Sequence, residues 1–254
     1  MKKRLDVLLV ERGLAESRTQ AQALVLAGRV PGYAKPGMQV DETAELLVST
    51  LPRYVSRGGE KLAHALDAFD VDPADRDCLD VGASTGGFTD VLLQRGAARV
   101  AAVDVGYGQI HERLRGDPRV VVLDRTNVRE LPELPFAPGL VVCDVSFISI
   151  RLALPPALAR AEPGWEAVVL VKPQFEAGRA EVGKGGVVRD VAVRRRVVQE
   201  IVESALAWEG ETVGVVDSGL PGPKGNREVF LHLVHRERPR LPDDIEEWIA
   251  AAVG

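Results

Sequence analysis

Two charged residues each stand at the end of a short apolar run, where a carboxylate and an ammonium group could do chemistry together. Asp144 follows the apolar run 140–143, and Lys172 follows the run 167–171. Such runs are typical of buried parallel strands, and sheets of this kind bind ligands beside the carboxyl ends of their strands. Because a buried charge is costly unless it is paired or used, the pattern predicts a catalytic pair or, as the alternative, a structural ion pair.

A glycine-rich turn upstream has the composition of a cofactor site. The run 78–81 leads into this turn, and a helix is expected from Phe88 onward. Glycines in a strand-to-helix turn let the backbone approach a ligand closely. The spacing matches neither the dinucleotide-binding pattern nor a phosphate-binding P-loop. The residues expected to hold a cofactor here are Asp80, Gly82, Ala83, Ser84, Thr85, Gly86 and Gly87.

Two further acids end the next predicted strands. Asp104, which Val105 follows, lies 24 positions after Asp80 and suits hydrogen bonds to a ribose diol. Asp124 ends the third strand and is expected to accept from an adenine amino group. Asp80, the glycines that follow it and Asp104 together resemble the pattern of the Rossmann-like methyltransferases. A turn shaped only by packing and an NAD-binding dehydrogenase are the alternatives.

The elements that must position these residues alternate between strands and helices. Short β-branched runs predict seven strands, at 78–81, 100–105, 120–123, 140–144, 167–172, 212–217 and 228–234. Helical spacing predicts helices at 60–69, 88–95, 109–114, 152–160 and 192–208. The alternation predicts an α/β fold over residues 60–254, a doubly wound and mostly parallel seven-stranded sheet with right-handed crossovers.

Residues 1–50 are expected to form a separate, small α+β unit, joined to the sheet by a linker at 51–59. A first helix ends at Gly13, and a second begins after the N-cap residue Ser17 and ends at Gly28. Short strands are expected at 38–40 and 45–48.

Charge is distributed unevenly along the chain. Residues 1–61 contain 10 Lys and Arg against 7 Asp and Glu, a net of +3, whereas the whole chain carries −5. The basic front favours contact with a nucleic acid, and a solvated basic face is the alternative. The residues expected to contact phosphates from one side of this unit are Lys3, Arg4, Arg18 and Arg29.

Composition disfavours several classes of protein. The apolar runs are far shorter than the ~20 residues that a membrane-spanning helix needs, and no secretory signal is recognisable, so we expect a cytoplasmic protein. Cys78 and Cys143 are expected to be small core residues rather than a disulfide. The four histidines show no metal-ligand spacing, so no metal is expected.

Four charged residues follow the order of a known catalytic tetrad. Lys61, Asp144, Lys172 and Glu228 resemble the Lys-Asp-Lys-Glu tetrad of FtsJ-type ribose 2′-O-methyltransferases. The segments around them resemble the TlyA family at 55–62, 82–89, 104–109, 144–149, 172–176 and 223–228. Residues 3–50 resemble the small RNA-binding domain shared by a ribosomal protein and many pseudouridine synthases, with a shorter loop at 31–36.

The resemblance implies a reaction, a cofactor and a partner. It implies methyl transfer from S-adenosylmethionine to the ribose 2′-hydroxyl of a cytidine in ribosomal RNA, in the large subunit and, as a second candidate, in the small subunit. The tetrad would be catalytic: Lys172, if neutral, would take the hydroxyl proton and, if charged, would orient the hydroxyl. The loop 178–189 is expected to fold over the substrate, with a plain surface loop as the alternative.

Three other functions are weighed against this one. A non-catalytic RNA-binding or ribosome-assembly factor would keep the fold, although the complete tetrad argues against lost activity. A small-molecule methyltransferase would leave the basic front without a role. A haemolysin, which the family's historical name suggests, is disfavoured because the sequence contains no notable cationic amphipathic helix.

Overall fold

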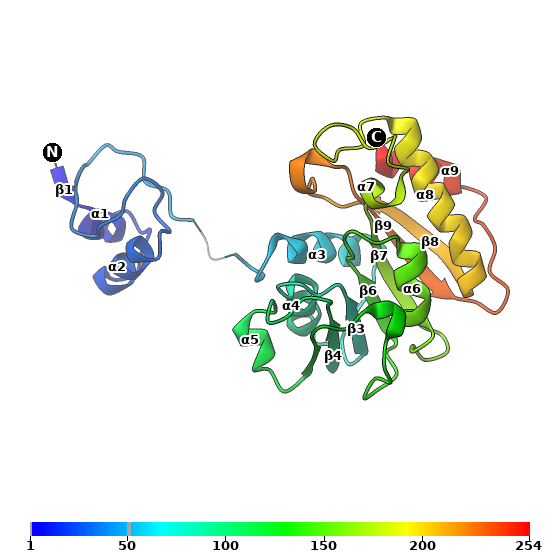
Figure 1. Ribbon diagram of the computed structural model, residues 1–254. Helices are drawn as coiled ribbons and strands as arrows, with labels where there is room; N and C mark the ends of the chain where they lie inside the picture. The colour runs from blue at the N-terminus through cyan, green and yellow to red at the C-terminus, as the bar shows by residue number, and fades with distance from the viewer. Residues whose placement is uncertain (1, 50–51) are drawn as a thin grey trace. The chain divides into compact units, whose positions relative to one another are not determined.

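The structure is a computed structural model that describes residues 2–49 and 52–254. The chain divides into two compact units, Met1–Arg53 and Tyr54–Gly254 (Figure 1). Each unit has a hydrophobic core of its own, and each is described by itself below.

The second unit begins at Tyr54, within the segment 51–59 that was predicted to be a linker. Tyr54 is buried in the core of the second unit, and a side chain on Gly59 would overlap its ring. Helix α3 (Arg57–Phe69) begins at Arg57 rather than at Glu60. The sequence prediction placed the start of this helix too late. Gly58 and Gly59 stand in its first turn, and they give no helical spacing of apolar residues.

The first unit combines two helices with a two-stranded ribbon. Helices α1 (Leu5–Glu11) and α2 (Arg18–Leu26) enclose an apolar core, and strand β1 (Lys2–Arg4) pairs antiparallel with β2 (Gln39–Asp41). This is the small α+β unit that the sequence predicts.

The start of α2 and the ends of α1 and α2 follow the predicted pattern. The N–H of Gln20 donates to Oγ of Ser17 at 3.2 Å, so Ser17 caps α2. Gly13 and Gly28 each have a φ of +69° just beyond a helix, a conformation that glycine adopts without strain.

One predicted strand of the first unit does not form. Residues 45–48 are extended but unpaired with another strand, and Leu46 turns into the core instead. The partner of β2 is β1, whose three residues are Lys-Lys-Arg and give no hydrophobic signal. The chain continues from 45–48 to Ser49, whose N–H donates to the carbonyl oxygen of Arg29 at 2.7 Å.

The second unit is built on a seven-stranded sheet in the order β5-β4-β3-β6-β7-β9-β8. Its strands are β3 (Asp77–Val81), β4 (Arg99–Val103), β5 (Val120–Leu123), β6 (Leu140–Cys143), β7 (Glu166–Val171), β8 (Gly210–Asp217) and β9 (Val229–His235). The first five run parallel, and β9 pairs antiparallel with β7 and β8. The predicted fold and all seven strands are confirmed, to within two residues at each end.

Helices cover both faces of this sheet (Figure 1). One face packs against α3, α4 (Gly87–Gln94) and α5 (Glu112–Arg115), and the other against α6 (Ile150–Leu158), α8 (Val191–Ala205) and α9 (Ile245–Val253). The predicted helix at 109–114 is shorter than expected, and α9 was not predicted. Within the described ranges, no helix is long and apolar enough to cross a membrane.

Both cysteines lie in the sheet as predicted. Cys78 on β3 and Cys143 on β6 are buried and free. Burial raises the pKa of each thiol to about 12, because a thiolate would be desolvated there. Neither thiol is therefore a nucleophile, and both act as small core side chains.

Candidate active site

The two charges that end β6 and β7 meet at the edge of the sheet. Nζ of Lys172 lies 2.5 Å from Oδ1 of Asp144 and donates to Oγ of Ser146 at 2.9 Å. Parallel pairing of β6 with β7 brings these strand ends together. The ammonium group of Lys172 is thus held by a carboxylate and a hydroxyl from one loop.

A second ion pair joins α3 to the start of β9. Nζ of Lys61 contacts Oε2 of Glu228, and Nε2 of Gln174 donates to Oε1 of the same carboxylate at 3.3 Å. Lys61 is 8% exposed and Glu228 is 2% exposed. A pair this buried requires both charges, because either one alone would be desolvated without compensation.

All four predicted catalytic residues line one cavity of about 530 Å³. Ser56, Arg57 and Pro221 contribute to its wall as well. The geometry therefore brings together two ammonium groups and two carboxylates, each cation beside its own anion. Such a site can position a hydroxyl group and stabilise negative charge that develops on it.

A neighbouring cavity of about 570 Å³ shares Gly82, Ser84 and Asp144 with the first. Gly82 has a φ of +85°, and a Cβ atom there would lie 2.7 Å from the carbonyl oxygen of Asp144. Glycine at this position therefore lets the ends of β3 and β6 approach each other and keeps the space between the cavities open.

Asp104 lines this second cavity with its carboxylate. Its Oδ2 accepts from the N–H of Ser84 at 2.8 Å, and its Oδ1 accepts from the N–H of Gly106 at 2.7 Å. These two bonds fix the carboxylate and leave lone pairs for a diol. Asp104 and Val105 both line this cavity, and their assignment to cofactor binding stays a prediction.

Three of the predicted cofactor residues do not line either cavity. Asp124 turns away: its Oδ2 accepts from Arg115 at 2.8 Å and from the N–H of Gly108 at 3.3 Å. The Arg115 guanidinium also lowers the pKa of this carboxyl. Thr126 and Asn127 line the cavity, whereas Asp124 does not, and its assignment to an adenine amino group stays a prediction.

Asp80 and Gly86 line neither cavity and instead contact residues that stabilise the glycine turn. Oδ2 of Asp80 accepts from the N–H of Thr89 at 2.9 Å and from its hydroxyl at 2.6 Å. Burial raises the pKa of Asp80 to about 7. Gly86 has a φ of +91° and lies against Leu114, so it serves packing. The remaining turn residues, Gly82, Ala83, Ser84, Thr85 and Gly87, line the cavities.

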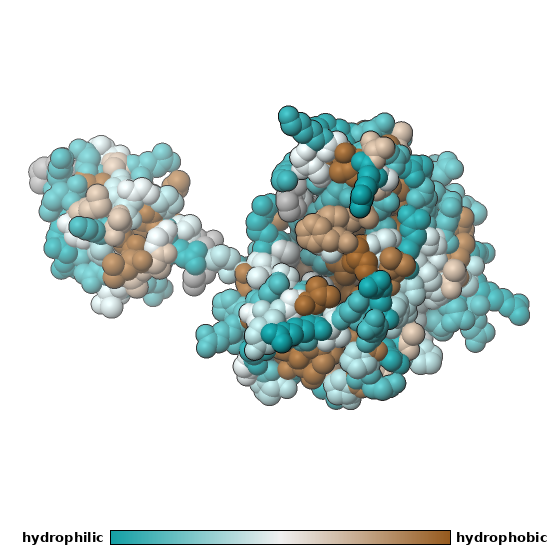
Figure 2. All heavy atoms as spheres, in the orientation of Figure 1, coloured by the Kyte–Doolittle hydropathy of each residue, from teal (hydrophilic) through white to brown (hydrophobic). Residues whose placement is uncertain are grey.

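Phe147 is a site residue that the sequence analysis did not single out. It is 91% exposed, its φ is +66°, and its ring centroid lies 5.0 Å from that of Phe175. A bulky residue held in the left-handed region is strained, and such strain concentrates at functional sites. Figure 2 shows hydrophobic side chains gathered near the middle of the visible face of the second unit. A single sequence cannot reveal that one phenylalanine of a motif faces outward.

The basic residues of the first unit are largely engaged within it. Nη2 of Arg4 and Nη2 of Arg18 lie 3.0 and 3.2 Å from Oδ2 of buried Asp6. Lys3 pairs with Glu11 at 2.9 Å and with Glu42 at 3.2 Å. Arg29 is half-buried. Part of their charge is therefore balanced locally, and contact of these four residues with phosphates stays a prediction.

The loop 178–189 is tied down at several points. Gly183 and Val187 form an antiparallel bridge, and the N–H of Val188 donates to Oδ1 of Asn226 at 3.2 Å. Together with Phe147 and Phe175, the loop lines a groove of about 470 Å³. That the loop folds over a substrate stays a prediction.

Comparison with known proteins shows where such a site occurs. Residues 54–235 match the FtsJ-like methyltransferase family, and residues 3–30 match the S4 domain. The 16S/23S rRNA (cytidine-2′-O)-methyltransferase TlyA of Mycobacterium tuberculosis is 51% identical over 98% of this chain and 97% of its own length. Hemolysin A of Brachyspira hyodysenteriae is 37% identical over 91% of this chain and 99% of its own length.

A solved structure is also similar to this chain over nearly its full length. A protein described as a hemolysin from Streptococcus thermophilus superposes with a TM-score of 0.76 at 41% identity, covering 98% of this chain and 94% of that one. The strand order and the family matches define a Rossmann-like methyltransferase domain that an S4 domain precedes in the sequence. Given its similarity to relatives over nearly their full length, the chain belongs to the TlyA family of FtsJ-like methyltransferases.

Proposed function

We propose that this protein transfers a methyl group from S-adenosylmethionine to the 2′-hydroxyl of a cytidine ribose in ribosomal RNA. The observation that carries the proposal is the convergence of Lys61, Asp144, Lys172 and Glu228 on one cavity beside the glycine turn. The names of the relatives support the substrate: one acts on 16S and 23S rRNA, and that of Campylobacter jejuni on 23S rRNA. We propose the ribosomal RNA of the large subunit as the substrate, with that of the small subunit as a second candidate.

The residues of the 570 Å³ cavity fit S-adenosylmethionine. Asp104 would accept from the ribose hydroxyls, and Thr126 and Asn127 offer polar groups beside them. Gly82, where a Cβ would collide with the carbonyl oxygen of Asp144, lets the glycine turn lie against the strand end that carries Asp144, so that the cofactor would be bound beside that residue. When bound, the cofactor supplies an electrophilic methyl group.

Lys172 acts on the hydroxyl group of the RNA. Because Asp144 and Ser146 hold its Nζ, the ammonium group is in place before the substrate arrives. Its charge would hold the 2′-oxygen in position and stabilise the negative charge that develops there, and the Asp144 carboxylate beside Nζ would be the acceptor for the hydroxyl proton. Lys61 and Glu228 line the same cavity, and we assign them to orienting the target nucleotide.

RNA is bound by both units in this proposal. The S4 domain would contact phosphates through Lys3, Arg4, Arg18 and Arg29, of which the partly exposed side chains of Arg4 and Arg18 keep donors beyond those that Asp6 occupies. In the second unit, Phe147 presents an exposed ring beside the catalytic cavity. Aromatic rings of this kind stack on unpaired bases.

The test is product identification on defined substrates. Purified protein and radiolabelled S-adenosylmethionine are incubated with naked ribosomal RNA and with each ribosomal subunit from a strain that lacks this methylation. Label in a cytidine whose 3′ linkage resists alkali supports the proposal and identifies the subunit. Label in a base, or in no RNA at all, would exclude it and favour another substrate or a binding factor.

A further inference from the structure

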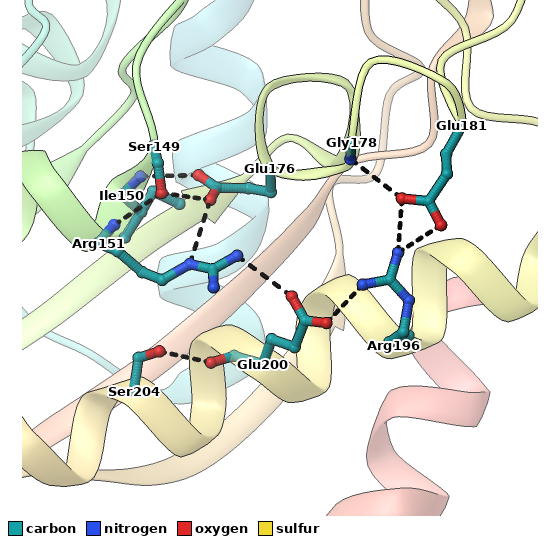
Figure 3. Close-up of polar contacts among 9 residues, drawn as sticks. All are labelled: Ser149, Ile150, Arg151, Glu176, Gly178, Glu181, Arg196, Glu200 and Ser204. Atoms are coloured by element: carbon teal, nitrogen blue, oxygen red, sulfur yellow. Dashed lines mark hydrogen bonds and ion pairs between the residues drawn. The ribbon is translucent and has the colours of Figure 1, made fainter.

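Glu176 is a buried carboxylate to which the tetrad assigns no role. Its side chain is 1% exposed, its Oε1 accepts from the N–H of Ile150 at 2.7 Å, and its Oε2 accepts from the hydroxyl of Ser149 at 2.6 Å (Figure 3). Burial raises the pKa of Glu176, against the effect of these two hydrogen bonds. A buried carboxylate is costly, so the contacts that hold this one must be specific.

These contacts join the two segments that carry the catalytic pair. Ser149 and Ile150 end the loop that holds Asp144, Ser146 and Phe147, and they begin α6. Glu176 ends α7 (Pro173–Glu176), the turn that directly follows Lys172. The carboxylate caps the start of α6 from outside that helix, where negative charge is favoured.

The same two segments meet at two further points, which lie on the cavity side. Lys172 contacts Asp144 and Ser146, and the ring of Phe175 lies 5.0 Å from the ring of Phe147. Those contacts involve partly or fully exposed groups that a substrate can displace. The contact of Glu176 is buried, so it is the one that persists when RNA enters.

An outer layer of ion pairs surrounds this contact (Figure 3). Nε of Arg151 lies 3.9 Å from Glu176, and Nη2 of Arg151 lies 3.2 Å from Glu200 on α8. Arg196 pairs with Glu200 at 2.5 Å and with Glu181 at 2.7 Å. These side chains are partly exposed, so each pair contributes little, and Glu200, which is linked to Glu176 through Arg151, provides a control for the outer layer.

We propose that Glu176 is a positioning residue for methyl transfer: it fixes the 144–150 loop to the turn after Lys172 and so sets the distance between Lys172, Asp144 and the reacting hydroxyl. The inference rests on the proposed function. Since a displacement of ~1 Å can cost a transfer reaction about 100-fold, a buried tie between the two catalytic segments acts on the rate of chemistry rather than on binding.

The experiment compares full-length Glu176→Gln, Ser149→Ala, Ser149→Thr and Glu200→Gln with the wild type. Initial rates of RNA methylation give kcat and the KM for RNA, calorimetry gives the Kd of S-adenosylmethionine, and thermal unfolding reports folding. We expect Glu176→Gln to lower kcat about tenfold or more, with KM and Kd within about threefold. Ser149→Ala should act in the same direction, Ser149→Thr should restore the rate because it keeps the hydroxyl, and Glu200→Gln should match the wild type.

Each outcome decides the matter. A folded Glu176→Gln variant with wild-type kcat would overturn the inference and leave the proposed function standing. So would a loss confined to KM, or an equal loss in Glu200→Gln. If the wild-type protein itself transfers no methyl group to ribosomal RNA, the proposed function fails and the inference falls with it.

Discussion

Lys61 and Glu228 form a buried ion pair inside the catalytic cavity although 167 positions separate them in the chain. A second pair, Lys172 with Asp144, lies in the same cavity. Each ammonium group therefore has its own carboxylate. In the proposed function, this arrangement would keep the positive charges close to the reacting hydroxyl without leaving either of them uncompensated.

Removing Lys61 should destabilise the second unit. In Lys61→Met the buried Glu228 carboxylate loses its cation, and we expect the free energy of unfolding to fall by about 3 kcal/mol. The double variant Lys61→Met/Glu228→Gln should recover part of this loss, because it removes the unpaired charge. Urea unfolding of the wild type, of Lys61→Met, of Glu228→Gln and of the double variant measures the coupling. A double variant whose loss of stability equals the sum of the two single losses would show that the pair is not coupled.

Asp104 should determine cofactor affinity, whereas Asp124 should not. Asp104→Ala removes the acceptor that faces the cavity and also leaves the N–H groups of Ser84 and Gly106 unpaired. We expect calorimetry to show S-adenosylmethionine binding about tenfold or more weaker. Asp124→Asn is the matched control, expected within about twofold of the wild type. A larger loss in Asp124→Asn would restore the role that the sequence suggested for it.

Phe147 should contribute to RNA binding and not to stability. Its ring is 91% exposed, so Phe147→Ala should leave the unfolding temperature unchanged. Loss of a base-stacking surface worth ~1–3 kcal/mol should raise the KM for RNA about tenfold. The Kd of the cofactor should change by less than this KM, although Phe147 also lines the cavity assigned to the cofactor. Leu152→Ala on α6, also an exposed apolar residue, is the control. An equal KM in the wild type and in Phe147→Ala would remove Phe147 from the RNA path.

Asp6 should make the first unit sensitive to acid. The neighbouring Arg4, with Gln22 and Arg18, holds the pKa of this carboxyl well below its usual range despite burial. The stabilisation is therefore present above the unfolded pKa of about 3.9 and is lost as the pH falls toward the lower folded pKa. Hydrogen-exchange protection factors of α1 in the full chain, measured from about pH 6 to pH 3, should fall in the wild type.

The variant Asp6→Asn provides the comparison. Its α1 should be less protected at neutral pH and should show a flatter dependence on pH. Glu16→Gln, at an exposed position, should behave like the wild type. A wild-type unit whose protection does not change with acid would exclude a structural role for the carboxylate.

The sheet was predictable because its signals are local. Continuous β-branched runs, each bounded by a helix or a turn, located all seven strands of the second unit. Strand β1 was missed because its residues are Lys-Lys-Arg, and because it pairs with a strand far along the chain, where even the nearest partners, Arg4 and Gln39, are 35 positions apart. Leu46 explains why a strand was wrongly predicted at 45–48. Its side chain packs into the core of the first unit, so the hydrophobic signal there reflects burial and not strand pairing.

The site was predictable in its polar strand ends and not in its side-chain directions. Asp144 and Lys172 each end a buried strand, and parallel pairing brings them together. Asp124 also ends a strand, but Arg115 on the preceding helix draws its carboxylate away. In the first unit, Asp6 holds Arg4 and Arg18 in the same way. Such choices depend on which oppositely charged group the fold brings beside each side chain, which spacing alone does not reveal.

The most direct test of the central claim compares the wild type with Lys172→Ala in a single-turnover reaction with radiolabelled S-adenosylmethionine and unmethylated ribosomal RNA. We predict alkali-resistant label in a cytidine ribose for the wild type. Lys172→Ala should be slower by about 100-fold or more while binding the cofactor within about twofold of the wild type. A Lys172→Ala protein that retains more than about a tenth of the rate would contradict the account, because the chemistry would then not depend on that ammonium group.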